Sequence, residues 1–129
     1  MDRQIASLMT RSVVTVDIDD TVENVERVLR EGAFAFVPVL GRQGECFGVI
    51  SASDIVQFHS RQENPKLRRA WEICTHQVIE VPPDTPMQKV ARLMLDKHVH
   101  HVVVTDAGRV AGVLSSLDLI DHFVVTCDR

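Results

Sequence analysis

Short apolar runs alternate with longer amphipathic stretches along the chain, and this order occurs twice. The β-branched runs at 13–16 and 78–81 predict short strands. After each run, apolar residues recur at helical spacing, and the polar residues Asp20 and Thr85 stand where a helix N-cap is expected. Each copy is therefore predicted to begin with a strand and a helix, and Gly32 is the expected stop of the first helix.

Two further strands and a second helix complete each copy. The nearly all-apolar runs at 36–39 and 102–104 predict buried strands. A turn containing glycine joins each of them to another apolar run, as in a β-hairpin, and a closing amphipathic helix follows. Short helical lead-ins at 4–9 and 67–74 precede the two copies. The pattern predicts an α/β (α+β) fold built from two βαββα units.

The two copies also match residue by residue. Thr10 recurs as Thr75 at a separation of 65 positions, and Asp54 recurs as Asp118 at a separation of 64, one residue having dropped out at a turn. One such unit is too small to close its own core, whereas two units packed sheet to sheet can. We expect a single module with pseudo-twofold symmetry over residues 1–129, divided into repeat 1 at 4–59, a polar linker at 60–66 and repeat 2 at 67–125.

Composition narrows the classes of function. A net charge of −4 and an aromatic content of 5% argue against nucleic-acid binding, which favours a basic face and stacking side chains. The longest apolar run, at 33–40, is too short to cross a membrane. Three cysteines without CxxC spacing do not form a disulfide framework, so a cytoplasmic location is expected.

A serine and an aspartate three residues apart follow the last strand of each copy. They are Ser51 and Asp54 in copy one, and Ser115 and Asp118 in copy two. A helix N-terminus suits a phosphate group, and an acceptor-only carboxylate can receive both hydroxyls of a ribose. The same spacing is also a helix-capping pattern, so capping alone stays an open alternative. The occurrence of the motif in both copies favours a pair of nucleotide sites.

In these features the chain resembles a pair of cystathionine-β-synthase (CBS) domains, often called a Bateman module. The resemblance is carried by residues 9–16, 36–39 and 48–54, and by the same signals from Thr75 to Asp118. It implies a non-catalytic sensor with two clefts that bind an adenosine-containing ligand such as AMP, ADP, ATP, NAD or S-adenosylmethionine, with no required cofactor, no catalytic residue and no metal. The implied contacts are Asp54 and Asp118 to ribose; Ser51, Ser53, Ser115, Ser116 and His101 to phosphate or ribose; and Thr10, Ser12, Val13, Val14, Thr75, Gln77, Val78 and Ile79 to adenine.

Two other functions stay open at this point. One is a CBS-pair dimerisation or interaction module with no nucleotide bound, and the other is a small metal-binding protein or enzyme that uses the histidines at 98–101. The expected partners are a second copy of the chain and a regulated protein, with neither nucleic acid nor membrane. The copies differ where Val103 replaces Pro38 and where His101 replaces Phe36, which predicts two unequal clefts.

Overall fold

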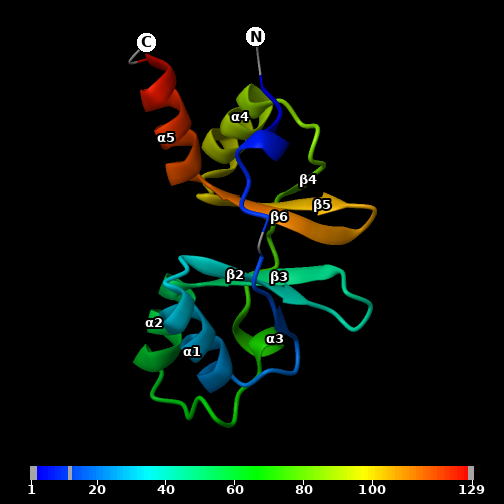
Figure 1. The fold of residues 1–129 in the computed structure, drawn as a ribbon. Coiled ribbons are helices and arrows are strands. Elements are labelled where there is room, and N and C mark those ends of the chain that lie inside the picture. Colours follow the sequence, from blue (N-terminus) through cyan, green and yellow to red (C-terminus); the bar gives the residue numbers. More distant parts are fainter. Residues whose placement is uncertain (1–2, 12, 128–129) are drawn as a thin grey trace. The chain divides into compact units, whose positions relative to one another are not determined.

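A computed structural model describes residues 3–11 and 13–127 and shows two three-stranded sheets with helices (Figure 1). In each sheet the middle strand runs parallel to the first strand and antiparallel to the third. The predicted α/β class and the order of elements in each copy are confirmed. The first sheet contains β1 (Val16–Asp17), β2 (Phe36–Leu40) and β3 (Cys46–Ser51), and the second contains β4 (Glu80–Val81), β5 (His101–Asp106) and β6 (Arg109–Ser115).

The chain forms two compact units that do not follow the order of the repeats. The first-sheet unit spans 14–78 and holds α1 (Val22–Gly32), α2 (Ala52–Ser60) and α3 (Ala70–Ile73). The second-sheet unit joins the residues up to 13 with those from 79 onward, and holds the 3-10 helix η1 (Ile5–Ser7), α4 (Met87–Lys97) and α5 (Ser116–Cys127). Each sheet is therefore completed by the lead-in of the other copy, and the blue N-terminal segment lies beside α4 in Figure 1.

The core of the first-sheet unit lies between its helices and one face of its sheet. Val22, Val25 and Leu29 recur at helical spacing on α1 and are buried, so α1 packs its apolar stripe inward. Strands β2 and β3 supply buried aliphatic side chains, and Phe58 of α2 is 1% exposed. Ala70 of α3, from the second lead-in, is also fully buried in this cluster.

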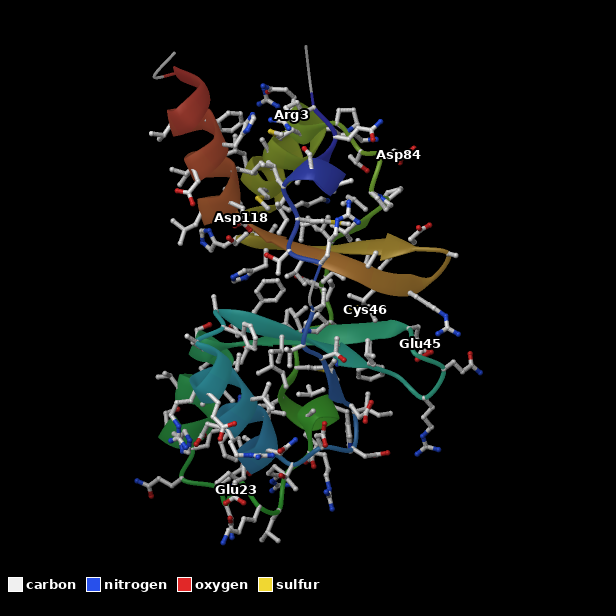
Figure 2. The ribbon with its side chains drawn as sticks, in the orientation of Figure 1. Arg3, Glu23, Glu45, Cys46, Asp84 and Asp118 are labelled. Carbon is white, nitrogen blue, oxygen red and sulfur yellow. The ribbon has the colours of Figure 1, made fainter. Side chains whose placement is uncertain are left out.

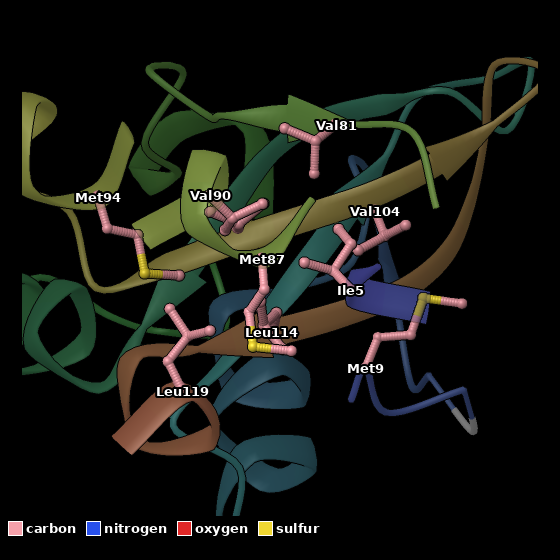
Figure 3. Packing of buried hydrophobic residues seen from close by; sticks show 10 residues of the cluster. Ile5, Met9, Val81, Met87, Val90, Met94, Val104, Leu114 and Leu119 are labelled. Atoms are coloured by element: carbon pink, nitrogen blue, oxygen red, sulfur yellow. The ribbon is translucent and has the colours of Figure 1, made fainter. Parts of the chain in front are cut away.

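The second-sheet unit has a matching core (Figure 3). Val90 and Met94 of α4 pack with Leu114 of β6, as helical and strand periodicity place them on the inner faces. Ile5 and Met9 from the N-terminal lead-in belong to the same cluster and are 0% and 8% exposed. The first lead-in is thus an integral part of the second unit.

Helix α1 begins one residue later than the sequence predicted. Its N-cap is Thr21, whose hydroxyl accepts a hydrogen bond from the Asn24 backbone N–H at 3.1 Å. The prediction of Asp20 as the cap was wrong, because the Asp20 carboxylate instead accepts a hydrogen bond from the Asp17 backbone N–H at 2.8 Å. That contact closes the turn between β1 and α1.

The start of α4 is shifted in the same direction. Its N-cap is Pro86, not the predicted Thr85, whose hydroxyl donates to the Pro82 carbonyl at 2.7 Å. Helix α1 does end at Gly32, as predicted, but the residue that adopts the left-handed conformation is the following Ala33, with φ of 53°. His98 takes the same conformation after α4, with φ of 55°.

Candidate functional site

The predicted Ser51 and Asp54 pair lies where β3 ends and α2 begins. Ser51 is the N-cap, and its hydroxyl accepts a hydrogen bond from the Asp54 backbone N–H at 3.4 Å. In return Asp54 Oδ2 accepts from the Ser51 backbone N–H at 2.8 Å, and the Ser51 hydroxyl lies 3.1 Å from the same oxygen. The pair is a capping box, which holds the carboxylate at the positive end of the α2 dipole.

Ser115 and Asp118 repeat this geometry between β6 and α5. Asp118 Oδ2 accepts from the Ser115 backbone N–H at 2.8 Å and lies 3.1 Å from the Ser115 hydroxyl, and the Asp118 N–H donates to that hydroxyl at 3.3 Å. Figure 2 shows Asp118 at the start of the last helix. The capping role is present in both copies, and it leaves the second carboxylate oxygen, Oδ1, for other partners.

The strand before each motif is flanked by the threonine that follows the lead-in of the other copy. Thr75 forms an antiparallel bridge with Val49, with backbone hydrogen bonds of 2.8 and 3.0 Å, and Thr10 forms the same bridge with Val113 at 3.0 and 3.1 Å. Val49 and Val113 are each two residues before the motif serine. In both units the fold therefore places a predicted adenine-contact threonine beside the strand that leads into the motif.

The glycine before each bridge allows this close approach. A Cβ on Gly48 would lie 2.7 Å from the Thr75 carbonyl oxygen and 3.0 Å from Cys74 Sγ. A Cβ on Gly112 would lie 2.6 Å from Met9 Sδ and 3.1 Å from the Thr10 carbonyl oxygen. Glycine at these positions of the strand lets a second backbone approach closely.

Thr75 also reaches Asp54, the predicted ribose anchor of its unit. Its hydroxyl lies 3.4 Å from Asp54 Oδ1 and 3.5 Å from Oδ2, so its single proton makes one long, bifurcated hydrogen bond to the carboxylate. Asp54 is partly buried and Thr75 is exposed. The two side chains thus form one polar cluster that is open to a ligand.

Cys74 is a neighbour of this cluster that the sequence did not single out. Its thiol approaches the Trp71 carbonyl at 3.7 Å and His76 Nε2 at 3.9 Å. Burial raises the pKa of the Cys74 thiol, and the nearby Asp54 carboxylate raises it further. The one available signal was its place in the repeat, where it precedes Thr75 as Met9 precedes Thr10.

The residue after each threonine differs between the units. His76 packs its ring against Phe47 edge to face, with ring centroids 5.0 Å apart. The equivalent residue in the second-sheet unit is Arg11, whose guanidinium donates to the Ala6 carbonyl at 3.0 Å. Arg11 and Arg3 line a surface hollow of about 450 Å³. His76 is thus part of an aromatic pair, whereas Arg11 faces a hollow lined by residues of the N-terminal segment.

The fold also brings the predicted phosphate contacts beside the motifs. His101, the first residue of β5, pairs in register with Ser115 and is partly buried. The Ser116 backbone N–H donates to the His100 carbonyl at 2.9 Å, which fixes the strand next to the start of α5. In the other unit Ser53 is exposed, and its hydroxyl lies 2.9 Å from that of Ser51.

The remaining predicted adenine contacts are spread over two connecting segments. Val13 is partly buried and Val14 is 41% exposed, whereas Ser12 lies outside the described residues. Gln77 is exposed and Val78 is partly buried. Ile79 packs against the core of the second-sheet unit, and its carbonyl accepts a hydrogen bond from Val103 at 3.0 Å. The contacts of Ile79 are therefore mainly with the core and with strand β5 of its own unit.

Two negative observations apply to the described part of the chain. Over residues 3–11 and 13–127, no three His, Cys, Asp or Glu side chains converge as metal ligands would. Helices in the same ranges are all too short or too polar to cross a membrane.

Comparison with known proteins identifies the type of repeat. The family model described as CBS domain matches the chain twice, at residues 5–61 and 70–125. Across 98% of this chain and 99% of its own, the crystal structure of the CBS domain pair of protein MJ0100 in complex with 5′-methylthioadenosine and S-adenosyl-L-methionine superposes with a TM-score of 0.89 at 21% identity. At that identity the likeness concerns the fold.

Curated relatives are longer than this chain. An uncharacterized protein of Methanocaldococcus jannaschii is 29% identical over 121 residues, which is 93% of this chain and 44% of the relative. The magnesium transporter MgtE of Thermus thermophilus is 34% identical over 120 residues, 88% of this chain and 25% of the transporter. The chain thus spans less than two thirds of the length of either protein.

Proposed function

Because the chain belongs to the CBS domain family, we propose that it is a non-catalytic regulatory module that binds an adenosine-containing ligand at the Asp54 and Asp118 motifs. The observation that carries the proposal is the repeated arrangement at the start of α2 and α5, where a partly buried capping aspartate follows a strand that is bridged to the threonine after a lead-in. The MJ0100 pair, which binds 5′-methylthioadenosine and S-adenosyl-L-methionine, supports this class of ligand. AMP, ADP, ATP, NAD and S-adenosylmethionine all contain the adenosine group that such sites would bind.

Each part of the cluster has a chemical role in this proposal. The carboxylates of Asp54 and Asp118 accept hydrogen bonds from ribose hydroxyls, and the helix N-terminus with its serine hydroxyl attracts a phosphate or carboxylate group. His101, in register with Ser115, adds a side chain at the second site. Thr10 and Thr75, with the residues that follow them, flank the adenine.

Regulation then follows from differential binding. A ligand shifts an equilibrium between two arrangements of the module only by the difference in its affinity for them. We propose that the module, residues 1–129, transmits this difference to a regulated protein or to a second copy of the chain. A cytoplasmic location agrees with the free thiols of Cys46 and Cys74.

A thermal-shift panel tests the proposal. Protein stripped of carried-over nucleotide is heated with AMP, ADP, ATP, NAD or S-adenosylmethionine. A ligand at a hundred times its Kd adds about 2.7 kcal/mol to the unfolding free energy, which raises the Tm by several degrees in a domain of this size. The absence of a shift with all five ligands would overturn the proposed function.

A second function, homodimerisation, is favoured by the surface of α5. Leu117, Ile120 and Val124 recur at helical spacing and remain 67%, 52% and 53% exposed, which makes an apolar stripe. We propose that this stripe contacts a second copy. Light scattering after size exclusion is expected to give a dimer mass for the wild type and a monomer mass for Ile120→Glu, with Leu67→Glu, at another exposed leucine, as the control. A monomeric wild type would contradict the proposal.

A further inference from the structure

The two aspartate motifs have the same capping geometry. In both, the cap uses one carboxylate oxygen, which leaves the other oxygen for a ligand. In both motifs Oδ2 receives the serine backbone N–H at 2.8 Å and lies 3.1 Å from the serine hydroxyl. A carboxylate oxygen has two lone pairs, so these two neighbours occupy Oδ2. Ribose hydroxyls must therefore donate mainly to Oδ1.

At Asp54, Oδ1 already accepts a hydrogen bond from a residue of the protein. The Thr75 hydroxyl lies 3.4 Å from Oδ1 and 3.5 Å from Oδ2, and its backbone is held in place by the bridge to Val49. A ribose hydroxyl that binds to Oδ1 must displace the threonine hydroxyl, which then needs a new partner. The existing contact therefore lowers the net gain from binding a ligand.

At Asp118 the same oxygen is open. None of the residues that the structure describes donates a hydrogen bond to Asp118 Oδ1. Thr10, the repeat equivalent of Thr75, makes both backbone bonds of its bridge to Val113, yet its hydroxyl is not bonded to the carboxylate. A ribose that approaches Asp118 thus has nothing to displace at Oδ1 among these residues.

Two further differences point the same way. The Ser51 hydroxyl is shared with that of Ser53 at 2.9 Å, whereas the repeat equivalent of Ser53 is the apolar Leu117. The Cys74 thiol lies close enough to Asp54 for the carboxylate to raise the thiol pKa, whereas the equivalent Met9 is a buried core residue. Among the described residues, the Asp54 carboxylate therefore has more polar neighbours than the Asp118 carboxylate.

We propose that Asp118 is the stronger ribose anchor and that Thr75 weakens the Asp54 site, so that an adenosine ligand fills the second-sheet unit first. The proposal rests on the proposed function, since it ranks two sites for the same class of ligand. Releasing one intramolecular hydrogen bond changes affinity roughly three- to tenfold. Thr75 is in this view a specificity-determining residue, because it sets the order in which the sites fill.

An NMR titration resolves the two sites within one sample. The ¹⁵N-labelled chain is titrated with adenosine, and again with whichever of the five panel ligands gives the largest Tm shift. Backbone amide shifts of residues 115–118 and 51–54 report the two sites separately. We expect the 115–118 shifts to reach their midpoint at a ligand concentration roughly three to ten times lower, and 2′,3′-dideoxyadenosine to abolish this difference.

Two matched variants test the role of Thr75. Thr75→Val removes the hydroxyl while it keeps the backbone bridge and a branched side chain, and should strengthen the Asp54 site roughly three- to tenfold. Thr10→Val, the equivalent change in the other unit, should not strengthen the Asp118 site, because the Thr10 hydroxyl makes no hydrogen bond to Asp118 that its removal would release. Far-UV circular dichroism confirms that both variants are folded.

The outcomes separate this inference from the function on which it rests. Equal midpoints, earlier saturation at 51–54, or weaker binding at the Asp54 site in Thr75→Val would overturn the ranking and leave the ligand-binding function standing. A lack of saturable shifts at both motifs, with adenosine and with all five panel ligands, would overturn the function and the ranking together.

Discussion

Thr75 and Val49 exchange two backbone hydrogen bonds, of 2.8 and 3.0 Å, across the edge of the first sheet. The bridge ties the lead-in of the second copy to the last strand of the first copy, directly before the Asp54 motif. Thr10 and Val113 do the same in the other unit. Each candidate site therefore requires residues from both copies of the repeat.

The glycines beneath these bridges should differ in their tolerance of a side chain. At Gly48 an added Cβ would lie 2.7 Å from the Thr75 carbonyl oxygen, which is backbone and can move only if the bridge shifts. At Gly112 the nearest atom is Met9 Sδ at 2.6 Å, part of a flexible side chain, and the Thr10 carbonyl is farther away at 3.1 Å.

We expect Gly48→Ala to destabilise the protein by about 1–3 kcal/mol, as overpacking does, and Gly112→Ala to cost less. Urea denaturation monitored by circular dichroism measures both changes. If Gly112→Ala were the more damaging substitution, the close contact at Gly48 would not be the constraint that we infer.

Phe58 should be a major contributor to the stability of the first-sheet unit. It is 1% exposed in the core cluster, so Phe58→Ala removes a large buried ring and leaves a cavity, at an expected cost of about 3–5 kcal/mol. Val56, on the same helix, is 69% exposed, and Val56→Ala should change the unfolding free energy by less than about 0.5 kcal/mol. Denaturant midpoints of the two variants provide the comparison, and similar costs would contradict the assigned core.

The elements that bury apolar side chains could be predicted from the sequence. The nearly all-apolar runs at 36–39 and 102–104 predict strands β2 and β5, and the turns that follow predict their hairpin partners. Strand β1 was placed at 13–16 but forms only at Val16–Asp17, because pairing with Val39 and Leu40 defines it and the β-branched pattern does not. The N-caps of α1 and α4 were misplaced by one residue, because the predicted caps Asp20 and Thr85 are used inside turns.

The exchange of the lead-ins could not be predicted. Both lead-ins are followed by a threonine, and both sheets offer a glycine against which a second backbone can pack, so local chemistry fits either pairing. The choice depends on long-range packing, such as the burial of Ile5 and Met9 among side chains of α4 and β6. The Ser-x-x-Asp motif was predictable as a cap, but the unequal surroundings of Asp54 and Asp118 arise from that exchange.

The two roles of Asp118 should be separable by substitution. Asp118→Asn keeps an oxygen that can accept the Ser115 backbone N–H, so the Tm without ligand should stay close to that of the wild type. Asp118→Ala removes the acceptor and should destabilise the protein by about 1 kcal/mol, the usual cost of a lost cap. Both variants should lose most of the ligand-induced Tm shift. A normal ligand shift in Asp118→Asn would exclude the carboxylate as a ribose anchor.

Cys74 provides a chemical probe of the Asp54 site. Because burial, and then the Asp54 carboxylate, raise the pKa of the Cys74 thiol, the reactive thiolate is scarcer at neutral pH than in a free cysteine. Alkylation of Cys74 by iodoacetamide at pH 7.5, followed by mass spectrometry of its peptide, should therefore be slower than in the urea-unfolded chain, and should accelerate as the pH rises into the alkaline range.

Removing the negative charge in Asp54→Asn should lower this pKa and speed the alkylation of Cys74, while Asp118→Asn, the matched change in the other unit, should have no effect. The same shift has a consequence for stability. A thiol whose pKa is raised in the folded state favours folding below the pKa of the unfolded thiol, so this contribution is retained at neutral pH and declines as the pH rises through the alkaline range. Equal alkylation rates in Asp54→Asn and the wild type would show that the carboxylate does not act on the thiol, and would weaken the view that Asp54 is the more heavily used anchor.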